Sequence, residues 1–356
     1  MPSPLSLASQ EWVFRALALG VGILALAMLV FAVVVIVLRL KHARTARDWA
    51  QREARWEATL LAVLAGDAAP QSLRDDVRQS ERRDFIEYLV RFARRVKGRE
   101  REQLQELAAP FLAVLEPDLS HRRADRRARA VQTLGDLGFV RYQEPVIAAL
   151  DDEAPLVRMI AARALTRPEH PDQVGLVLEK LHLFPTWSPN FLAAMLADAG
   201  MAAVPALRAA LGDPAREAPV RAIAATALTY LGDLEAADVA VTVLGGRHDV
   251  PDLLASSLRL IAKLGRPEHA AAVRPLIDSG HFAVRAAAIS ALGAIGGPDD
   301  LAAIREGYDD ASPWVAMHAA RALVDAGDVR SLEEIVARRH SRASLAIQVL
   351  SELEEE

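Results

Sequence analysis

The feature that most constrains this chain is a period of about thirty-one residues that runs through its last two thirds. Each copy is a short apolar, alanine-rich stretch that ends on an aliphatic residue, with spacings of 31, 31, 32, 33, 31, 31 and 27 between copies. A fixed period of this size is typical of stacked supersecondary units. The aliphatic residues, which we call anchors, are Leu134, Leu165, Leu196, Leu228, Ile261, Leu292, Leu323 and Leu350.

Each unit has the pattern of two short helices. Around Leu228, apolar residues recur at helical spacing, Gly232 then ends the helix, and a second apolar stretch follows at residues 236–244. Two short antiparallel helices cannot bury both of their apolar faces alone, so each pair must pack against its neighbours. The sequence therefore predicts an all-α fold in which residues 117–356 form an α-solenoid of seven helix pairs and a terminal half, without β-sheet.

The repeated stretch resembles the short bacterial HEAT repeats called PBS-lyase HEAT-like. It begins with Val-Arg and continues through paired alanines to the anchor, most clearly at residues 157–165, 220–233 and 284–293. The resemblance implies a structural ladder, in which an arginine seven residues before the anchor meets an aspartate of an inter-repeat turn. Pro189, Leu254, Ala316 and Ala343 replace the arginine in half of the units. The residues expected in the ladder are Arg127, Arg158, Arg221, Arg285, Asp152, Asp213, Asp278 and Asp310.

Residues 16–38 carry no charge, and twenty-three residues at about 1.5 Å each suffice to cross a hydrocarbon core of about 30 Å. We expect a transmembrane helix here rather than a cleaved signal peptide, because residues 1–10 have no charged side chain. Only Arg15 closely precedes the span, whereas six basic residues follow it between residues 39 and 55. The positive-inside rule then predicts a single-pass protein of the bacterial inner membrane, with residues 1–15 outside and the repeats in the cytoplasm.

Residues 39–116 have helical periodicity but no copy of the repeat, and we expect them to form a helical stem and an N-terminal cap for the solenoid. The start of the stem is basic and contains Trp49 and Trp56. One interpretation is a stem that lies near anionic lipid headgroups. The simpler interpretation is a continuous helix whose charges follow the positive-inside rule.

Charge and composition exclude several classes of function. Residues 121–356 hold 25 basic and 32 acidic side chains, a net charge of −7, which argues against nucleic acid as a partner. The absence of cysteine excludes disulfides and cysteine-bound metals. An Arg-Pro-Glu-His sequence occurs at 167–170 and 266–269, but its order, copy number and register do not fit the iron sites of HEAT-repeat hydroxylases. We expect no metal, no cofactor and no small-molecule substrate.

The hypothesis that remains is a non-enzymatic scaffold, tethered to the membrane through residues 16–38, that binds a protein partner at the inner membrane. Accessory subunits of envelope or exopolysaccharide assembly are one context for such a layout. The alternative is a membrane-bound enzyme of lyase or hydroxylase type. We expect the second helices to line the concave side and the acidic balance to favour a basic or mixed partner. The expected second helices are residues 142–150, 173–181, 204–211, 236–244, 270–277, 300–306 and 331–338.

The repeat is most irregular between residues 181 and 190, where two aromatic residues stand beside two prolines. Phe184 and Trp187 are therefore candidate contacts for the partner, since exposed aromatic side chains often dominate binding energy. However, Trp187 lies nine residues before its anchor, a position that Leu156 and Trp314 occupy in their own units. This shared register favours packing between neighbouring turns, and both interpretations stay open.

Overall fold

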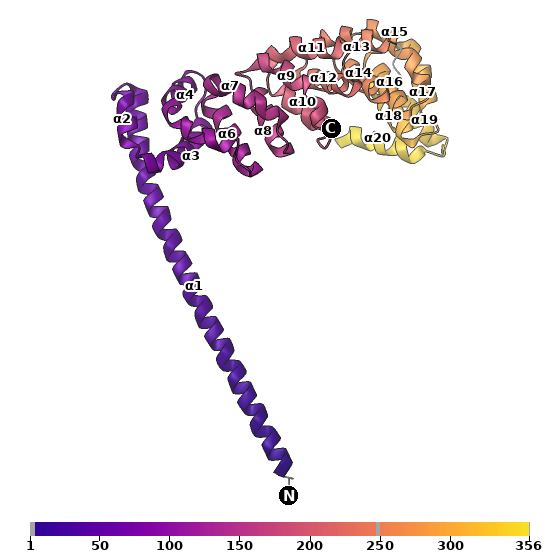
Figure 1. Ribbon diagram of the computed structural model, residues 1–356. Helices are drawn as coiled ribbons and strands as arrows, with labels where there is room; N and C mark the ends of the chain where they lie inside the picture. The colour runs from indigo at the N-terminus through magenta and orange to yellow at the C-terminus, as the bar shows by residue number, and fades with distance from the viewer. Residues whose placement is uncertain (1–3, 247–249, 356) are drawn as a thin grey trace. The chain divides into compact units, whose positions relative to one another are not determined.

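The computed structural model describes residues 4–246 and 250–355, with their side chains except at 354, 355 and several positions before residue 47. All regular elements in these ranges are helical, which confirms the predicted all-α fold (Figure 1). The chain divides into two compact units, Met1–Val114 and Leu115–Glu356. The helices of the first unit are α1 (Pro4–Ala65), α2 (Pro70–Asp76), η1 (Gln79–Glu81), α3 (Arg82–Ala93) and α4 (Arg99–Leu112), with η2 (Ala113–Leu115) at the boundary.

The second unit contains the repeats. Its helices are α5 (Glu116–Leu119), α6 (Ala124–Leu137), α7 (Phe139–Ala148), η3 (Ala149–Asp151), α8 (Pro155–Leu165), η4 (Pro171–Gln173), α9 (Val174–Glu179), η5 (Leu181–Leu183), α10 (Pro189–Ala197), η6 (Met201–Ala203), α11 (Val204–Gly212), α12 (Ala218–Leu231), α13 (Ala236–Leu244), α14 (Pro251–Leu264), η7 (Pro267–His269), α15 (Ala270–Val273), η8 (Arg274–Asp278), α16 (Phe282–Ile295), η9 (Pro298–Asp300), α17 (Leu301–Gly307), α18 (Pro313–Asp325), α19 (Val329–Ala337) and α20 (Ala343–Glu355).

Helix α1 runs without interruption through the expected span and the start of the stem. Over the described residues, no single helix is both long and apolar enough to cross a membrane, although α10 followed by Met201–Gly212 passes as a bent pair by length and composition alone. The side chains of residues 1–15, expected outside the membrane, lie outside the described set.

The end of α1 packs into the core of the first unit. Trp56 and Leu60 are fully buried, and the Trp56 ring lies edge-on to Phe85 of α3 at 5.4 Å between ring centroids. Two basic residues of the stem are paired within this unit: Arg52 with Asp84 and Arg55 with both Asp76 and Glu81. The continuous helix is thus observed, and these two basic side chains have acidic partners within the unit.

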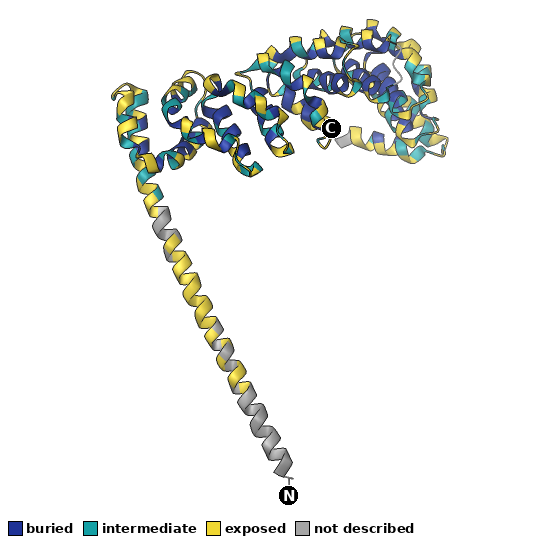
Figure 2. Ribbon diagram, in the orientation of Figure 1, coloured by how far each residue is buried: buried dark blue, intermediate teal, exposed yellow. Residues whose placement is uncertain are grey.

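In the second unit, the described residues form seven helix pairs and a terminal single helix, as the period predicted. A first helix of each pair carries the anchor, and the anchors from Leu134 to Leu323 are at most 1 % exposed. Leu350 of α20 is only partly buried. Figure 2 shows the buried residues gathered between the two helices of successive pairs.

The first helices form the inner row of the curved array, and the second helices form its outer row (Figure 1). Our expectation that second helices line the concave side is therefore wrong. The reason is side-chain size. A Cβ added to Gly293 of α16 would lie 2.6 Å from the Cα of Ala322 in α18, and one on Gly135 would lie 2.7 Å from the Cβ of Ala164. First helices approach one another closely, whereas second helices touch little, so the array closes on the side of the small residues.

The inner row is interrupted once. Consecutive first helices pack along their lengths from α6 to α8 and from α10 to α18, but α8 and α10 meet at most at isolated points. The irregular segment 181–190 lies between these two helices in sequence. The array is thus two packed blocks, joined mainly through contacts of α9 with α11.

Candidate functional site

The predicted arginine ladder is formed at two positions. Arg127 of α6 binds Asp152 through two hydrogen bonds of 2.8 Å, and its remaining nitrogen donates to the carbonyl of His121 at 2.8 Å. Arg285 of α16 binds Asp310 in the same way, at 2.7 and 2.9 Å. Each contact joins a first helix to the turn one unit later, 25 residues on. These two arginine–aspartate pairs, which we call rungs of the ladder, therefore connect successive units.

Both aspartates also organise their own turns. Asp152 accepts a hydrogen bond from the backbone N–H of Ala154 at 2.8 Å, and Asp310 accepts one from Ser312 at 2.7 Å. The arginine hydrogen bonds, aided by these N–H groups, hold the pKa of each carboxyl below its ordinary value. The ladder carboxylates stay ionised at neutral pH and bind a guanidinium firmly.

The other predicted ladder residues do not pair in this way. Arg158 donates only to the carbonyl of Asp152, at 3.3 Å, and Arg221 donates to the carbonyl of Leu211, at 2.9 Å. Arg221 is almost fully buried, and this burial lowers its pKa. Neither arginine meets an aspartate because no acidic residue lies 25 positions later: Leu183 and Gly246 stand there. The predicted ladder is thus interrupted.

A second ladder, which the sequence did not lead us to expect, runs along the second helices. In three units an arginine binds the aspartate that stands just before the second helix of the next pair. The arginine lies on a second helix or on the 3-10 helix that continues it. The spacing of 23 to 26 residues is close to that of the first ladder, so an arginine-to-aspartate search at this spacing would have found it. The pairs are Arg208 with Asp233, Arg274 with Asp300 and Arg305 with Asp328.

In the unit between these pairs, the acidic residue lies on the second helix and the basic residues lie in the turn of the next unit. Asp238 lies on α13, and Arg266 and His269 of the following turn bind it, both at 3.0 Å. His269 is buried, and its Nδ1 accepts the backbone N–H of Arg266. The Arg-Pro-Glu-His copy at 266–269 is thus part of the second ladder. In the other copy, His170 stacks on Phe139 with ring centroids 3.5 Å apart.

The two candidate contact residues lie in different environments. Phe184 is 2 % exposed, so it offers no surface to a partner in this structure. Trp187 is half-buried, stacks on Phe191 at 5.2 Å between centroids, and has a buried indole N–H without an acceptor. Its neighbours in register, Leu156 and Trp314, are 50 % and 58 % exposed. The shared register therefore does not mark packing between turns in those two units.

Exposed aromatic side chains are instead collected on the first helices. Phe191, Tyr230, Phe282 and Trp314 are all exposed, and each belongs to a first helix. A first helix packs against its neighbours in the inner row and against second helices behind it, so its open face is the concave one. The concave face also carries exposed basic residues, including Arg163 and Arg259. This face thus combines exposed aromatic side chains with basic groups.

The described residues offer few groups arranged for catalysis. Among the described residues, no group of three or more His, Cys, Asp or Glu side chains is arranged to hold a metal ion. Ser290 and His318 form a hydrogen bond of 2.8 Å, but the charged groups that act on His318 are Arg321 and Arg259. Burial and these two cations lower the pKa of His318. A catalytic base is usually oriented by a third, acidic group, which this pair does not show.

Residues 244–324 match a family model described as HEAT repeats. This segment is therefore similar to HEAT repeats, as the resemblance implied, and it is where the first helices pack most tightly. No curated protein matches the chain at a significant level.

Several solved structures are similar to this chain at low sequence identity. One is the complex of CpcE and CpcF of phycocyanin lyase from Nostoc sp. PCC7120, with 18 % identity, 68 % of this chain and 94 % of that chain covered, and a TM-score of 0.33. Human deoxyhypusine hydroxylase in complex with glycerol shows 18 % identity, with 78 % and 97 % covered and a TM-score of 0.30. Kap121p shows 14 % identity, with 82 % and 38 % covered and a TM-score of 0.41. Similarity at this level says nothing about activity.

Proposed function

We propose that this HEAT-repeat chain is a membrane-anchored, non-enzymatic scaffold that binds a protein partner along the concave row of first helices. The observation that carries the proposal is the collection of exposed aromatic residues on that row. Large aromatic side chains at the centre of a concave surface are the usual anchors of protein interfaces. Tyr230 and Trp314 are more than half exposed and lie in separate units, so an extended partner could contact both.

The membrane anchor is the second part of the proposal. The twenty-three uncharged residues at 16–38 support it, together with the exposure of every described side chain in that range. An apolar stretch that no other part of its unit covers needs another apolar environment. The basic residues that follow it favour a cytoplasmic array.

A differential capture experiment tests the scaffold. The full chain is purified from membranes with its partners after crosslinking, as wild type and as the double variant Tyr230→Ser, Trp314→Ser. We expect the double variant to lose the crosslinked partner with little change in melting temperature, because both side chains are exposed. The matched control is Val140→Ser, Leu234→Ser, which alters two exposed apolar residues outside the first helices. Equal loss in both variants, or retention in both, would contradict the proposed surface.

Reporter fusions test the topology. A reporter that is active only outside the cytoplasm, fused after Glu356, should stay inactive, and a cytoplasmic reporter at the same place should be active. The opposite pattern would refute the orientation. Metal and chromophore analysis of the purified full chain tests the enzyme alternative, since stoichiometric iron or a bound pigment would favour a hydroxylase or lyase.

A further inference from the structure

The first ladder lacks its arginine at Asp213, and a pocket lies beside this aspartate. Asp213 lies 24 residues after the ladder position, one fewer than the two ladder aspartates, and makes the same local hydrogen bond, since it accepts the backbone N–H of the second residue after it, Ala215, at 2.9 Å. The arginine that would reach it from the preceding first helix is replaced by Pro189, the exposed first residue of α10. The turn therefore presents a carboxylate that no arginine of the preceding first helix binds.

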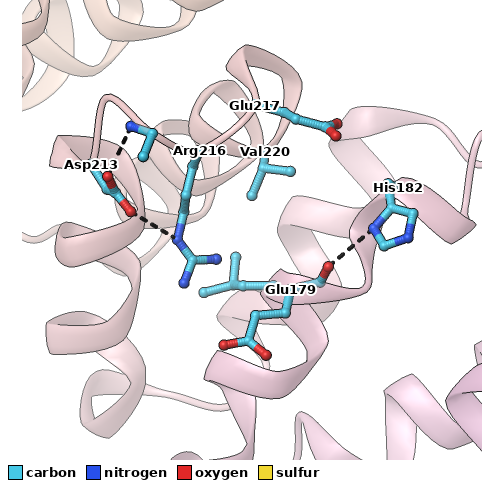
Figure 3. Close-up of a pocket in the computed structure, with 8 residues that line it drawn as sticks. Glu179, His182, Asp213, Arg216, Glu217 and Val220 are labelled. Carbon is cyan, nitrogen blue, oxygen red and sulfur yellow. Dashed lines mark hydrogen bonds and ion pairs between the residues drawn. The ribbon is translucent and has the colours of Figure 1, made fainter.

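The space beside Asp213 has a volume of about 310 Å³. Its apolar lining comes from Leu178 and Val220, which are both buried. Its polar lining includes three carboxylates and two basic groups (Figure 3). These are Glu179, Asp213, Glu217, Arg216 and His182.

Arg216 does not complete the missing rung. Its Nε lies 3.7 Å from Asp213, whereas the arginines of the two filled rungs approach their aspartates to between 2.7 and 2.9 Å with two nitrogens each. Arg216 also balances only one of the three carboxylates that line the pocket. The pocket thus keeps an excess of negative charge and an acceptor geometry that elsewhere in this chain holds arginine.

The position of the pocket adds a structural consequence. Its two walls are the end of α9 with the following turn, and the turn that leads into α12. These walls belong to the two blocks of the array, which meet weakly between α8 and α10. A group bound in the pocket would contact both blocks.

We propose that this pocket binds the guanidinium of an arginine side chain of the protein partner, which completes the missing rung in trans. Arginine suits it better than lysine because a planar guanidinium binds a carboxylate through two hydrogen bonds. The methylene groups of the arginine would lie on Leu178 and Val220, as long basic side chains do on apolar surfaces. The inference rests on the proposed scaffold function and specifies the partner's chemistry: a segment with an exposed arginine.

The first test uses acetyl-arginine amide as the probe and the full chain in lipid nanodiscs, with saturation-transfer NMR as readout. We expect binding of this probe and none of its neutral isostere, acetyl-citrulline amide. Asp213→Asn keeps the acceptor for the Ala215 N–H but removes the charge, and should weaken binding by at least about fivefold. The matched control is Asp278→Asn, a turn aspartate in the same register whose unit has the buried Leu254 in place of the arginine. Binding of citrulline, or an equal effect of the two variants, would overturn the proposal.

A second variant supplies the arginine in cis. Pro189→Arg should fill the rung and abolish probe binding, while the melting temperature stays unchanged or rises. Unaltered probe binding to a folded Pro189→Arg protein would place the probe elsewhere and overturn the assignment. The Asp213→Asn result stands on its own if Pro189→Arg does not fold.

A photo-crosslinking residue at Ala215, which is exposed and lines the pocket, connects the pocket to the partner. We expect a crosslinked partner peptide that contains arginine, at a yield that Asp213→Asn reduces. If a partner crosslinks equally well in Asp213→Asn, the inference fails while the scaffold function stands. If the probe binds but no partner is captured by any variant, the scaffold function fails instead.

Discussion

Arg285 shows how one residue couples two units of the array. Its guanidinium bridges Asp310 and the carbonyl of Ser279, so a single side chain fixes two turns. The side chains of Arg285 and Asp310 are each less than one fifth exposed, which limits screening of their interaction by water and salt. Rungs of this kind contribute to stability through geometry and hydrogen bonding rather than through charge alone.

Replacing Arg285 by Gln should lower the melting temperature of the array at neutral pH. The effect depends on pH in a definite direction. Arg285 lowers the folded pKa of Asp310 below the ordinary 3.8, so its contribution is complete above that value and is lost as the pH falls through the folded pKa. The difference between wild type and variant should therefore stay constant from neutral pH to about 5 and shrink below about 4.

Thermal unfolding followed by circular dichroism at several pH values measures this difference. Arg163→Gln is the control, because Arg163 is exposed on a first helix and should change stability by less than about 0.5 kcal/mol. A difference that grows at low pH would contradict the assigned role of the pair.

Trp187 is intermediate between core and contact. Full truncation of a buried tryptophan costs about 3 to 5 kcal/mol, and a half-buried ring stacked on one exposed neighbour should cost about half of that. We expect Trp187→Ala to lower the free energy of unfolding by about 2 kcal/mol in urea titration. A loss below about 0.5 kcal/mol would instead indicate a surface contact residue.

At the scale of helices, the close approach of first helices depends on residues without bulk. Gly293 and Ala322 bring α16 and α18 together, and the same position is filled by Gly135 and Ala164 between α6 and α8. Neither glycine has a positive φ, so their role is space rather than backbone freedom. Dense packing of this kind tolerates added volume poorly.

Gly293→Ala should therefore destabilise the array, by about 1 to 3 kcal/mol, although alanine is the better helix former. The added methyl would lie 2.6 Å from the backbone of Ala322, and the backbone cannot move aside as a flexible side chain could. Gly280→Ala is the matched control, since nothing lies within 4 Å of its added Cβ. Urea midpoints of the two variants measure the contrast, and equal midpoints would show that the helices are not in tight contact.

For the molecule as a whole, the interruption between α8 and α10 matters most. Solenoid stability is a sum over neighbouring units, so a weak interface lets the blocks on either side open separately. The weak interface coincides with the missing ladder pair of Arg158, since Leu183 stands where its aspartate would be, and with the irregular segment 181–190. Absence of the rung and absence of helix packing occur at the same place.

Native-state hydrogen exchange should reveal this weak point. Amides of residues 181–197 should exchange faster than those of α16, which packs against both α14 and α18. Local opening explains the order, because α10 packs along a first helix on one side only and α16 does so on both. Uniform protection across the array would show that the two blocks unfold as one.

Much of the fold was determined by local sequence. The period, the helix pairs and the buried anchors follow from spacing alone, because every anchor must be buried whichever way the stack curves. Arg127 and Arg285 could be assigned to the ladder because an aspartate stands 25 residues after each. Pro189 at the ladder position also indicates that Asp213 has no arginine from the preceding first helix. The sequence by itself does not show that the space beside Asp213 stays open.

Only the tertiary structure decided which row lies inside the curve, where Phe184 is buried, and that α8 and α10 separate. Each depends on distances between helices that are far apart in sequence, and these distances reflect side-chain volumes summed over several units. The spacing of the second ladder is present in the sequence, but Arg208 and Asp233 meet because their units stack at one spacing. Spacing along the chain sets what each helix must bury, and packing between helices sets which face remains open to a partner.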